Sequence, residues 1–279
     1  MPGAYLACRN VTDVNSGPAP WTVHCAPPPG GNASPGCQSL AGQTARSRPS
    51  ILQTTAHVDS GPSARNSAPL LQAVDLAGQR GERALFRHLA LDLVPGSVTW
   101  LRGRNGRGKT SLLRLLAGLA TPMAGAVNVA GQPVRRSQPD WRRGLVYIGH
   151  QNALKDDLTA AEALAFLLQL RGAAPDTAQI DAALERLGVR TSRRALVRTL
   201  SQGQRRRVAL ARLALSLEQP LWLLDEPFDA LDADGVTALN NLLADHAAQG
   251  GATLLTSHQP LSLAAPVPRI FDLDHHGLA

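Results

Sequence analysis

One stretch of the sequence combines glycine, lysine and threonine in a pattern suited to binding phosphate. It reads GRNGRGKTSLLRLLAG, and it lies between a predicted strand and a predicted helix, as a phosphate-binding loop requires. Its glycines allow positive φ angles, so backbone amides can turn towards phosphate oxygens. Lys109 is one of only two lysines among 28 basic residues. Its compact ammonium can reach phosphate oxygens, whereas a planar guanidinium needs a different geometry. The predicted phosphate-binding residues are Gly103, Arg104, Asn105, Gly106, Arg107, Gly108, Lys109, Thr110 and Ser111.

A second motif, LWLLDE at residues 221–226, supplies two carboxylates. Its four apolar residues predict a buried strand that delivers Asp225 to the carboxyl end of a parallel sheet, where ligands bind. Asp225 and the Thr110 hydroxyl would then hold Mg²⁺. Glu226 would polarise an attacking water. The alternative interpretation is an ordinary acidic turn at the end of a strand.

The segment LSQGQ, at residues 200–204, is where the chain resembles the ATP-binding cassette family. It matches the family signature LSGGQ at four of five positions, and Gln202 replaces the first glycine. The resemblance implies that the signature acts on ATP held by a second cassette, with the Ser201 hydroxyl and Gly203 amide facing phosphate. One cassette per chain then implies a homodimer that encloses two ATP molecules. The signature residues are Leu200, Ser201, Gln202, Gly203 and Gln204.

Other positions extend this resemblance. It implies that Gln151 senses the γ-phosphate and Mg²⁺, that His258 contacts the γ-phosphate, and that Arg80 replaces the usual aromatic residue stacked on adenine. A guanidinium plane can also stack on a base. The predicted catalytic residues are therefore Glu226, His258 and Gln151, and the predicted Mg²⁺ ligands are Thr110, Gln151 and Asp225. The loop that would communicate across the dimer is Ala230, Leu231 and Asp232.

Three segments resemble the ATPase subunit of the haem exporter of cytochrome c biogenesis: VYIGHQ from Val146, FDALD from Phe228, and TSHQPL from Thr256. This implies assembly with integral membrane subunits at the cytoplasmic face of the inner membrane, with haem involved only indirectly. No direct contact with nucleic acid is expected. The alternatives are an ATPase of another transporter, a nucleic-acid-associated cassette protein, and a regulatory subunit that binds nucleotide without turnover.

The elements that must position these residues alternate between strand and helix from about residue 69 onward. We expect an α/β P-loop NTPase fold of the cassette type, with a mainly parallel core sheet, an antiparallel β edge and a helical subdomain at about 152–200. This domain would occupy residues 68–279. Residues 1–67 contain 7 Gly and 9 Pro without sustained periodicity, so we expect disorder. They are either a tether or the product of a mis-assigned start, and we favour the second.

Composition restricts the function classes only weakly. The formal net charge of +7 suits an anionic partner, or it reflects arginine-rich coding. Within Arg205–Arg207 we expect at least two side chains on a solvated helix face. The three cysteines, Cys8, Cys25 and Cys37, have no metal or redox spacing. Because no apolar run is long enough to span a bilayer and the amino terminus does not resemble a secretory signal, we expect a cytosolic chain.

Overall fold

The computed structural model describes residues 68–134 and 139–275. The predicted disorder of residues 1–67 and the three cysteines therefore lie outside the described residues. The described residues belong to the second of two units, Pro62–Ala279. No helix among them is long and apolar enough to cross a membrane.

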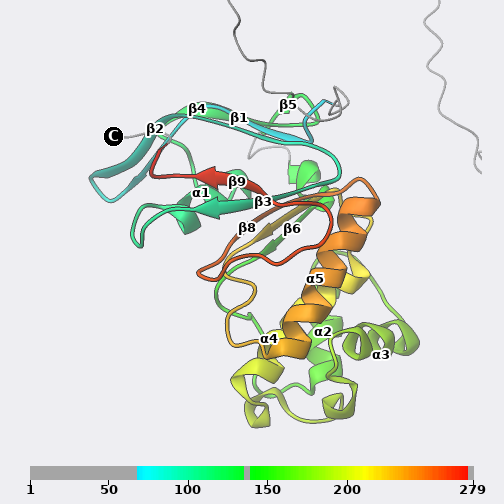
Figure 1. Ribbon diagram of the computed structural model, residues 1–279. Coiled ribbons are helices and arrows are strands. Elements are labelled where there is room, and N and C mark those ends of the chain that lie inside the picture. Colours follow the sequence, from blue (N-terminus) through cyan, green and yellow to red (C-terminus); the bar gives the residue numbers. More distant parts are fainter. Residues whose placement is uncertain (1–67, 135–138, 276–279) are drawn as a thin grey trace, which may run out of the picture. The chain divides into compact units, whose positions relative to one another are not determined.

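Two sheets form the framework of this unit (Figure 1). The first is antiparallel, in the order β2-β1-β4-β5. Its strands are β1 (Leu71–Arg80), β2 (Arg83–Leu93), β4 (Ala124–Val129) and β5 (Gln132–Pro133). The sequence predicted antiparallel strands at an edge of the core sheet, and the structure gives them a sheet of their own.

The second sheet is parallel throughout, in the order β6-β7-β8-β3-β9. Its strands are β3 (Ser97–Arg102), β6 (Leu145–Ile148), β7 (Leu221–Leu224), β8 (Ala252–Thr256) and β9 (Arg269–Asp272). The predicted LWLL strand is β7, and all four of its residues are buried. Strand β9 was not predicted, because a short strand with two exposed residues carries little hydrophobic signal.

Five α-helices connect and cover the strands in the described residues. They are α1 (Lys109–Leu116), α2 (Ala160–Gln169), α3 (Thr177–Arg186), α4 (Gln202–Ala211) and α5 (Ala233–Ala248). Helices α2, α3 and α4 each begin with a capping box, in which the cap side chain and the residue three positions later bond each other's backbone. Short 3₁₀ turns lie at Pro139–Gly144, Arg190–Ser192, Val197–Thr199 and Arg212–Leu215.

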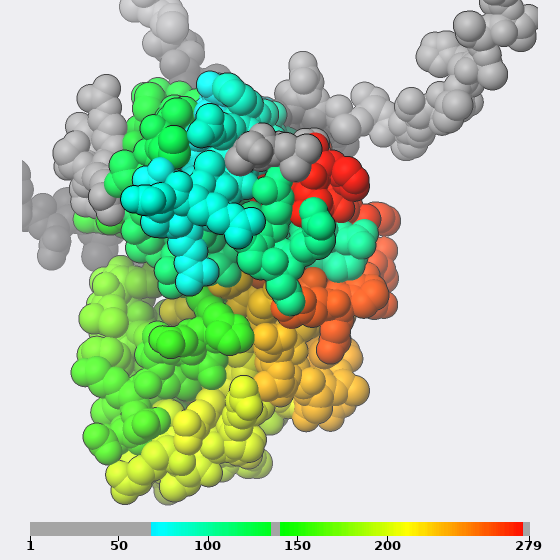
Figure 2. All heavy atoms as spheres, turned by 90° about the vertical axis from the view of Figure 1, so that its left-hand side faces the viewer, coloured from blue at the N-terminus to red at the C-terminus, as the bar shows by residue number. Residues whose placement is uncertain are grey.

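The two faces of the parallel sheet bury separate apolar clusters. Trp222 and Leu224 of β7 pack on the side of α2 to α5, whereas Leu221 and Leu223 face α1 and the antiparallel sheet. Figure 2 shows the same division on the surface, with the cyan residues of β1 and β2 at one end and the yellow-green residues of α3 and α4 at the other. The phosphate-loop helix α1 therefore lies between the sheets, and the signature helix α4 belongs to the other layer.

The prediction that at least two of Arg205–Arg207 are solvated is wrong. Arg206 is 3% exposed and Arg207 is 9% exposed. The Arg207 guanidinium donates to the Leu187 carbonyl (3.1 Å) and contacts the Asp232 carboxylate at the start of α5. The prediction failed because a run of arginines on a helix resembles a solvated face, although each guanidinium can also satisfy several buried acceptors.

Candidate functional site

A cavity of about 240 Å³ opens at the carboxyl ends of the parallel strands, where β3 meets α1 and β7 ends. Residues from the phosphate loop, from the end of β7 and from the end of β8 line it together. The lining residues are Arg80, Leu85, Arg104, Asn105, Gly106, Gly108, Lys109, Thr110, Ser111, His150, Glu226, Asp229 and His258. The sequence therefore predicted most of this lining.

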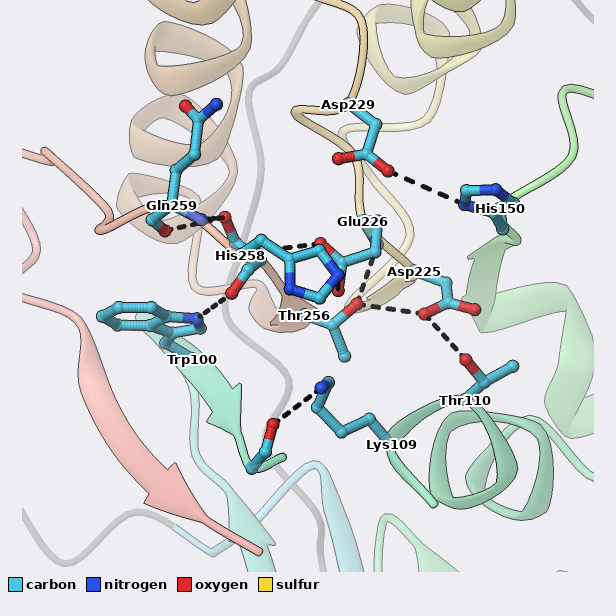
Figure 3. Close-up of polar contacts among 12 residues, drawn as sticks. Trp100, Lys109, Thr110, His150, Asp225, Glu226, Asp229, Thr256, His258 and Gln259 are labelled. Carbon is cyan, nitrogen blue, oxygen red and sulfur yellow. Dashed lines mark hydrogen bonds and ion pairs between the residues drawn. The ribbon is translucent and has the colours of Figure 1, made fainter. Parts of the chain in front are cut away.

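The phosphate loop has the backbone that its glycines predicted. Gly103, Gly106 and Gly108 have φ angles of 143°, 77° and 107°, which favour glycine over other residues. The first amides of α1 have no partner inside the helix, and those of Thr110 and Ser111 donate to no acceptor among the described residues. Free amides at a helix amino terminus suit an anion. The Lys109 ammonium lies over the loop, where it donates to the Gly103 carbonyl (2.7 Å) (Figure 3).

Two of the three residues predicted to hold Mg²⁺, Thr110 and Asp225, lie in contact beside this loop. The Thr110 hydroxyl donates to Asp225 Oδ1 (3.2 Å), and the Thr256 hydroxyl of β8 donates to the same oxygen (3.0 Å) (Figure 3). Among the described residues no group of three or more His, Cys, Asp or Glu could hold a metal by itself. Mg²⁺ is usually bound through one or two carboxylates plus substrate phosphates, so the Thr110–Asp225 pair beside a phosphate loop fits this ion.

Glu226 lies against His258 at the other side of the cavity. Its Oε2 accepts a hydrogen bond from the His258 amide (3.1 Å), and its Oε1 is 3.5 Å from the His258 Nε2 (Figure 3). Burial raises the pKa of the Glu226 carboxyl, although the charge of His258 opposes that shift. The Glu226 backbone has φ +49°, a left-handed conformation that is unfavourable for glutamate and is typical of functional sites.

Of the two remaining residues predicted for this site, one lines the cavity and the other does not. Arg80, expected near adenine, is exposed and lines the cavity. Gln151 is exposed and does not line the cavity, so its assignment to Mg²⁺ and the γ-phosphate stays a prediction. Its neighbour His150 does line the cavity, with Nδ1 3.7 Å from Asp229 Oδ2. His150 and Asp229 were not predicted as site residues, although both lie inside the segments VYIGHQ and FDALD.

Three of the five signature residues line a second cavity, of about 450 Å³, that shares no lining residue with the first. Ser201, Gly203 and Gln204 line it together with Ala230 and Asp232 of the loop that follows Glu226. Leu200 is buried, whereas Gln202 is exposed and lines neither cavity. Leu231 is half-buried and also lines neither. A signature that served the nucleotide of its own chain would share the first cavity.

Local contacts explain two of the signature residues. The Ser201 hydroxyl accepts from the Gln204 amide (3.2 Å) as the cap of α4. Because an accepting hydroxyl keeps its own proton, Ser201 can still donate to an anion. A Cβ atom at Gly203 would lie 2.7 Å from the Ala230 carbonyl oxygen. Gly203 therefore allows the signature to approach the 230–232 loop closely.

A residue near the carboxyl end of the described chain also contacts the phosphate loop. Asp274, two residues after the end of β9, accepts from the Arg104 amide through Oδ2 (2.9 Å), and its Oδ1 lies 3.4 Å from the Arg107 Nε. The hydrogen bond from the Arg104 backbone amide lowers the pKa of the Asp274 carboxyl. No sequence pattern indicated this contact, because it depends on the pairing of β9 with β3.

Comparisons with known proteins show the family to which this chain is similar. The family model described as ABC transporter matches residues 86–229. The chain is 47% identical over 207 residues to the cytochrome c biogenesis ATP-binding export protein CcmA of Aromatoleum aromaticum, a match that covers 74% of this chain and 96% of that protein. It is also 47% identical over 194 residues to the protein of the same name from Pseudomonas aeruginosa, covering 70% and 95%.

Solved structures share the fold. One is an ABC transporter ATP-binding protein from Pyrococcus furiosus, with a TM-score of 0.63 and 21% identity, covering 75% of this chain and 99% of that one. Another is a dimeric ATP-binding cassette bound to ADP and phosphate, with a TM-score of 0.59 and 22% identity, covering 68% and 88%.

Proposed function

The chain belongs to the ATP-binding family of ABC transporters, and from that premise we propose that it hydrolyses ATP at the cavity formed by Lys109, Thr110, Glu226 and His258. The observation that carries the proposal is the convergence of free helix-terminal amides, an ammonium, a Thr–Asp oxygen pair and a partly desolvated glutamate around one cavity. Phosphoryl transfer needs this combination of positioning and charge.

Each of these groups has a distinct role. The loop amides and Lys109 hold the phosphates in place. Thr110 and Asp225, with Gln151 as a further predicted ligand, would hold Mg²⁺, which supplies charge neutralisation for the transferred phosphoryl group. Glu226 accepts a proton from the attacking water, since a raised pKa makes its carboxylate a stronger base. His258 lines the cavity beside Glu226 and stabilises charge on the γ-phosphate.

The site is proposed to be completed by a second copy of the chain. The separate cavity of Ser201, Gly203 and Gln204 supports this arrangement, because these residues do not reach the phosphate loop of their own chain. In a face-to-face dimer each signature would close over the nucleotide of the other copy, and Ala230–Asp232 would lie at the contact. The Ser201 hydroxyl and Gly203 amide would then donate to the γ-phosphate.

The names of the relatives indicate the process in which the chain would act. Proteins 47% identical to this chain are named cytochrome c biogenesis ATP-binding export proteins. We therefore propose that this chain supports cytochrome c maturation as a peripheral subunit at the cytoplasmic face of the inner membrane. There it would assemble with integral membrane subunits, and its ATP hydrolysis would drive export of haem or release of a haem-loaded chaperone. Haem itself would not contact this chain.

Genetic complementation tests this proposal. A bacterial strain that lacks its own cytochrome c biogenesis ATP-binding subunit should recover covalently haem-bound cytochrome c when it expresses the parental chain. The Lys109→Ala chain should fail to restore it, and should also lose retention of ATP in equilibrium binding. If the parental chain hydrolyses ATP but restores no cytochrome c, the ATPase assignment holds and the chain serves a transporter with another cargo. Unchanged ATP affinity in Lys109→Ala would remove the phosphate-loop assignment.

A further inference from the structure

Three arginines cover the open edge of the parallel sheet. β6 is the last strand on one side, so half of its carbonyls point away from the neighbouring strand β7. The Ile148 carbonyl faces β7 and accepts from the Asp225 amide (2.8 Å). Each alternate carbonyl accepts from an arginine instead: Leu145 from Arg171 (2.6 Å), Tyr147 from Arg212 (2.9 Å) and Gly149 from Arg206 (3.2 Å).

Arg206 differs from the other two because it also reaches the hydrolytic site. Its Nη2 donates to the carbonyls of Asp225 (3.1 Å) and Glu226 (2.6 Å), and its Nε donates to Pro227 (3.4 Å). Its Nη1 donates to Gly149 and to the Asn152 side chain (3.1 Å). One guanidinium therefore joins the segment that carries Glu226 to both flanks of the pair His150–Gln151.

In these contacts the buried, positively charged guanidinium of Arg206 donates to neutral oxygen atoms. Arg206 has no salt bridge with a carboxylate among the described residues. Desolvation lowers the pKa of its guanidinium, and the charges of Asp229, Asp225 and Glu226 oppose that shift. Burying a cation is unfavourable unless its donors are satisfied, and here five acceptors from two segments satisfy them.

The backbone of Glu226 is held from both sides. Its amide donates to the Thr256 hydroxyl (2.8 Å), and its carbonyl accepts from Arg206. The left-handed conformation of this residue, with φ +49°, persists only when its surroundings enforce it. The Glu226 carbonyl also accepts from the Asp229 amide (3.2 Å) within its own loop, so Arg206 supplies the restraint that ties this carbonyl to another element, α4.

We propose that Arg206 is a positioning residue for ATP hydrolysis, because it fixes the Asp225–Pro227 backbone against the His150–Gln151 segment and so orients Glu226 towards the attacking water. This inference rests on the proposed function. It requires no direct contact between Arg206 and ATP. Arg206 does not line the cavity, so its substitution should alter turnover more than nucleotide binding.

The test compares Arg206→Gln, Arg206→Lys and the control Arg171→Gln in the full chain. Arg171 donates to the Leu145 carbonyl of β6 and to the Arg143 carbonyl before it, at the opposite end of the strand from Glu226. The kcat and KM for Mg-ATP, the affinity for ADP and the thermal unfolding temperature are measured for each variant. Arg206→Gln should lower kcat by about 10- to 100-fold with ADP affinity unchanged, since small displacements of catalytic groups have effects of this size.

The conservative variant separates positioning from a simple loss of charge. Arg206→Lys keeps the positive charge, but its kcat should remain low because an ammonium cannot replace the guanidinium fork that joins the two segments. Arg171→Gln should retain the parental kcat and ADP affinity.

Several results would overturn the inference. Parental kcat in Arg206→Gln would do so, as would an equal loss of kcat in Arg171→Gln. If Arg206→Gln does not fold, Arg206→Lys decides, and parental turnover in that variant overturns the inference. Glu226→Gln, measured beside them, tests the proposed function separately. Hydrolysis that does not depend on Glu226 overturns both, whereas Glu226-dependent hydrolysis that tolerates Arg206→Gln overturns the inference alone.

Discussion

Glu226 combines the features expected of a general base in a single residue. It is 8% exposed, its carboxylate accepts from the His258 amide, and burial raises its pKa. Glu226→Gln preserves the shape of the side chain but removes the proton acceptor. We expect kcat to fall by about 10²- to 10⁴-fold while ATP remains bound, so that the variant accumulates as an ATP-bound dimer.

Turnover and gel filtration with Mg-ATP measure both effects. In the parental chain, kcat should also decrease as the pH falls through the raised pKa, because the protonated carboxyl cannot accept a proton. A Glu226→Gln chain with the parental turnover would contradict this role.

His246 should make the stability of the protein depend on pH. The ring is fully buried, stacks on Trp222 at 3.8 Å, and lies within hydrogen-bond distance of Thr253 (3.1 Å) and the Gln219 carbonyl (2.9 Å). Burial lowers its pKa in the folded state. Above a pH of about 6.5, the pKa of histidine in the unfolded chain, His246 is neutral in the folded and the unfolded state, and its contribution to the free energy of unfolding is fully present. Below it the unfolded state binds the proton more readily, so the free energy of unfolding falls.

Urea denaturation between about pH 8 and pH 5.5 measures this effect. The control is His246→Phe, which keeps an aromatic ring against Trp222 and removes the titration. That variant should be less stable at high pH by about 1–3 kcal/mol, since the Gln219 carbonyl loses its donor. Its stability should nevertheless depend less steeply on pH than that of the parental chain. Equal slopes for the two chains would show that His246 does not titrate on unfolding.

At the scale of elements, β9 connects the carboxyl end of the described chain to the phosphate loop. It pairs with β3, and Asp274 after it accepts from the Arg104 amide inside the loop. Asp274→Ala should therefore weaken ATP binding by roughly three- to tenfold with a smaller effect on kcat. Asp140→Ala is the control, because it removes an exposed carboxylate paired with Arg143 outside the site. Equal ATP affinities for Asp274→Ala and the parental chain would contradict a role for β9.

The elements also show what a sequence can and cannot predict. The phosphate loop and the LWLLDE strand were predicted, because each is a local pattern whose chemistry follows from adjacent residues. Thr256, Asp274 and Arg206 were not, because their roles depend on which strands and helices become neighbours. The Thr256 hydroxyl forms hydrogen bonds with both Asp225 and Glu226 because β8 pairs with β7. For Arg206 the local pattern indicated the opposite environment, and tertiary packing decided its burial.

At the scale of the whole molecule, the described unit carries two separate cavities, which we propose to be the two halves of one site. The cavity of Lys109 and Glu226 lacks the signature, and the cavity of Ser201 and Gly203 lacks a phosphate loop. If two copies bring the halves together, activity belongs to the dimer. ATP hydrolysis per chain should then decrease on dilution below the concentration at which the dimer dissociates.

Mixing two inactive chains tests this central claim most directly. Lys109→Ala destroys the phosphate loop and keeps the signature. Gly203→Asp keeps the loop but adds a carboxylate at a position where even a Cβ atom would lie 2.7 Å from the Ala230 carbonyl oxygen. Each variant alone should be inactive. When the two folded chains are mixed with Mg-ATP, the account predicts that ATP hydrolysis returns, because each mixed dimer contains one intact loop facing one intact signature. A mixture that forms dimers but stays inactive would contradict it, as would full activity of Gly203→Asp alone.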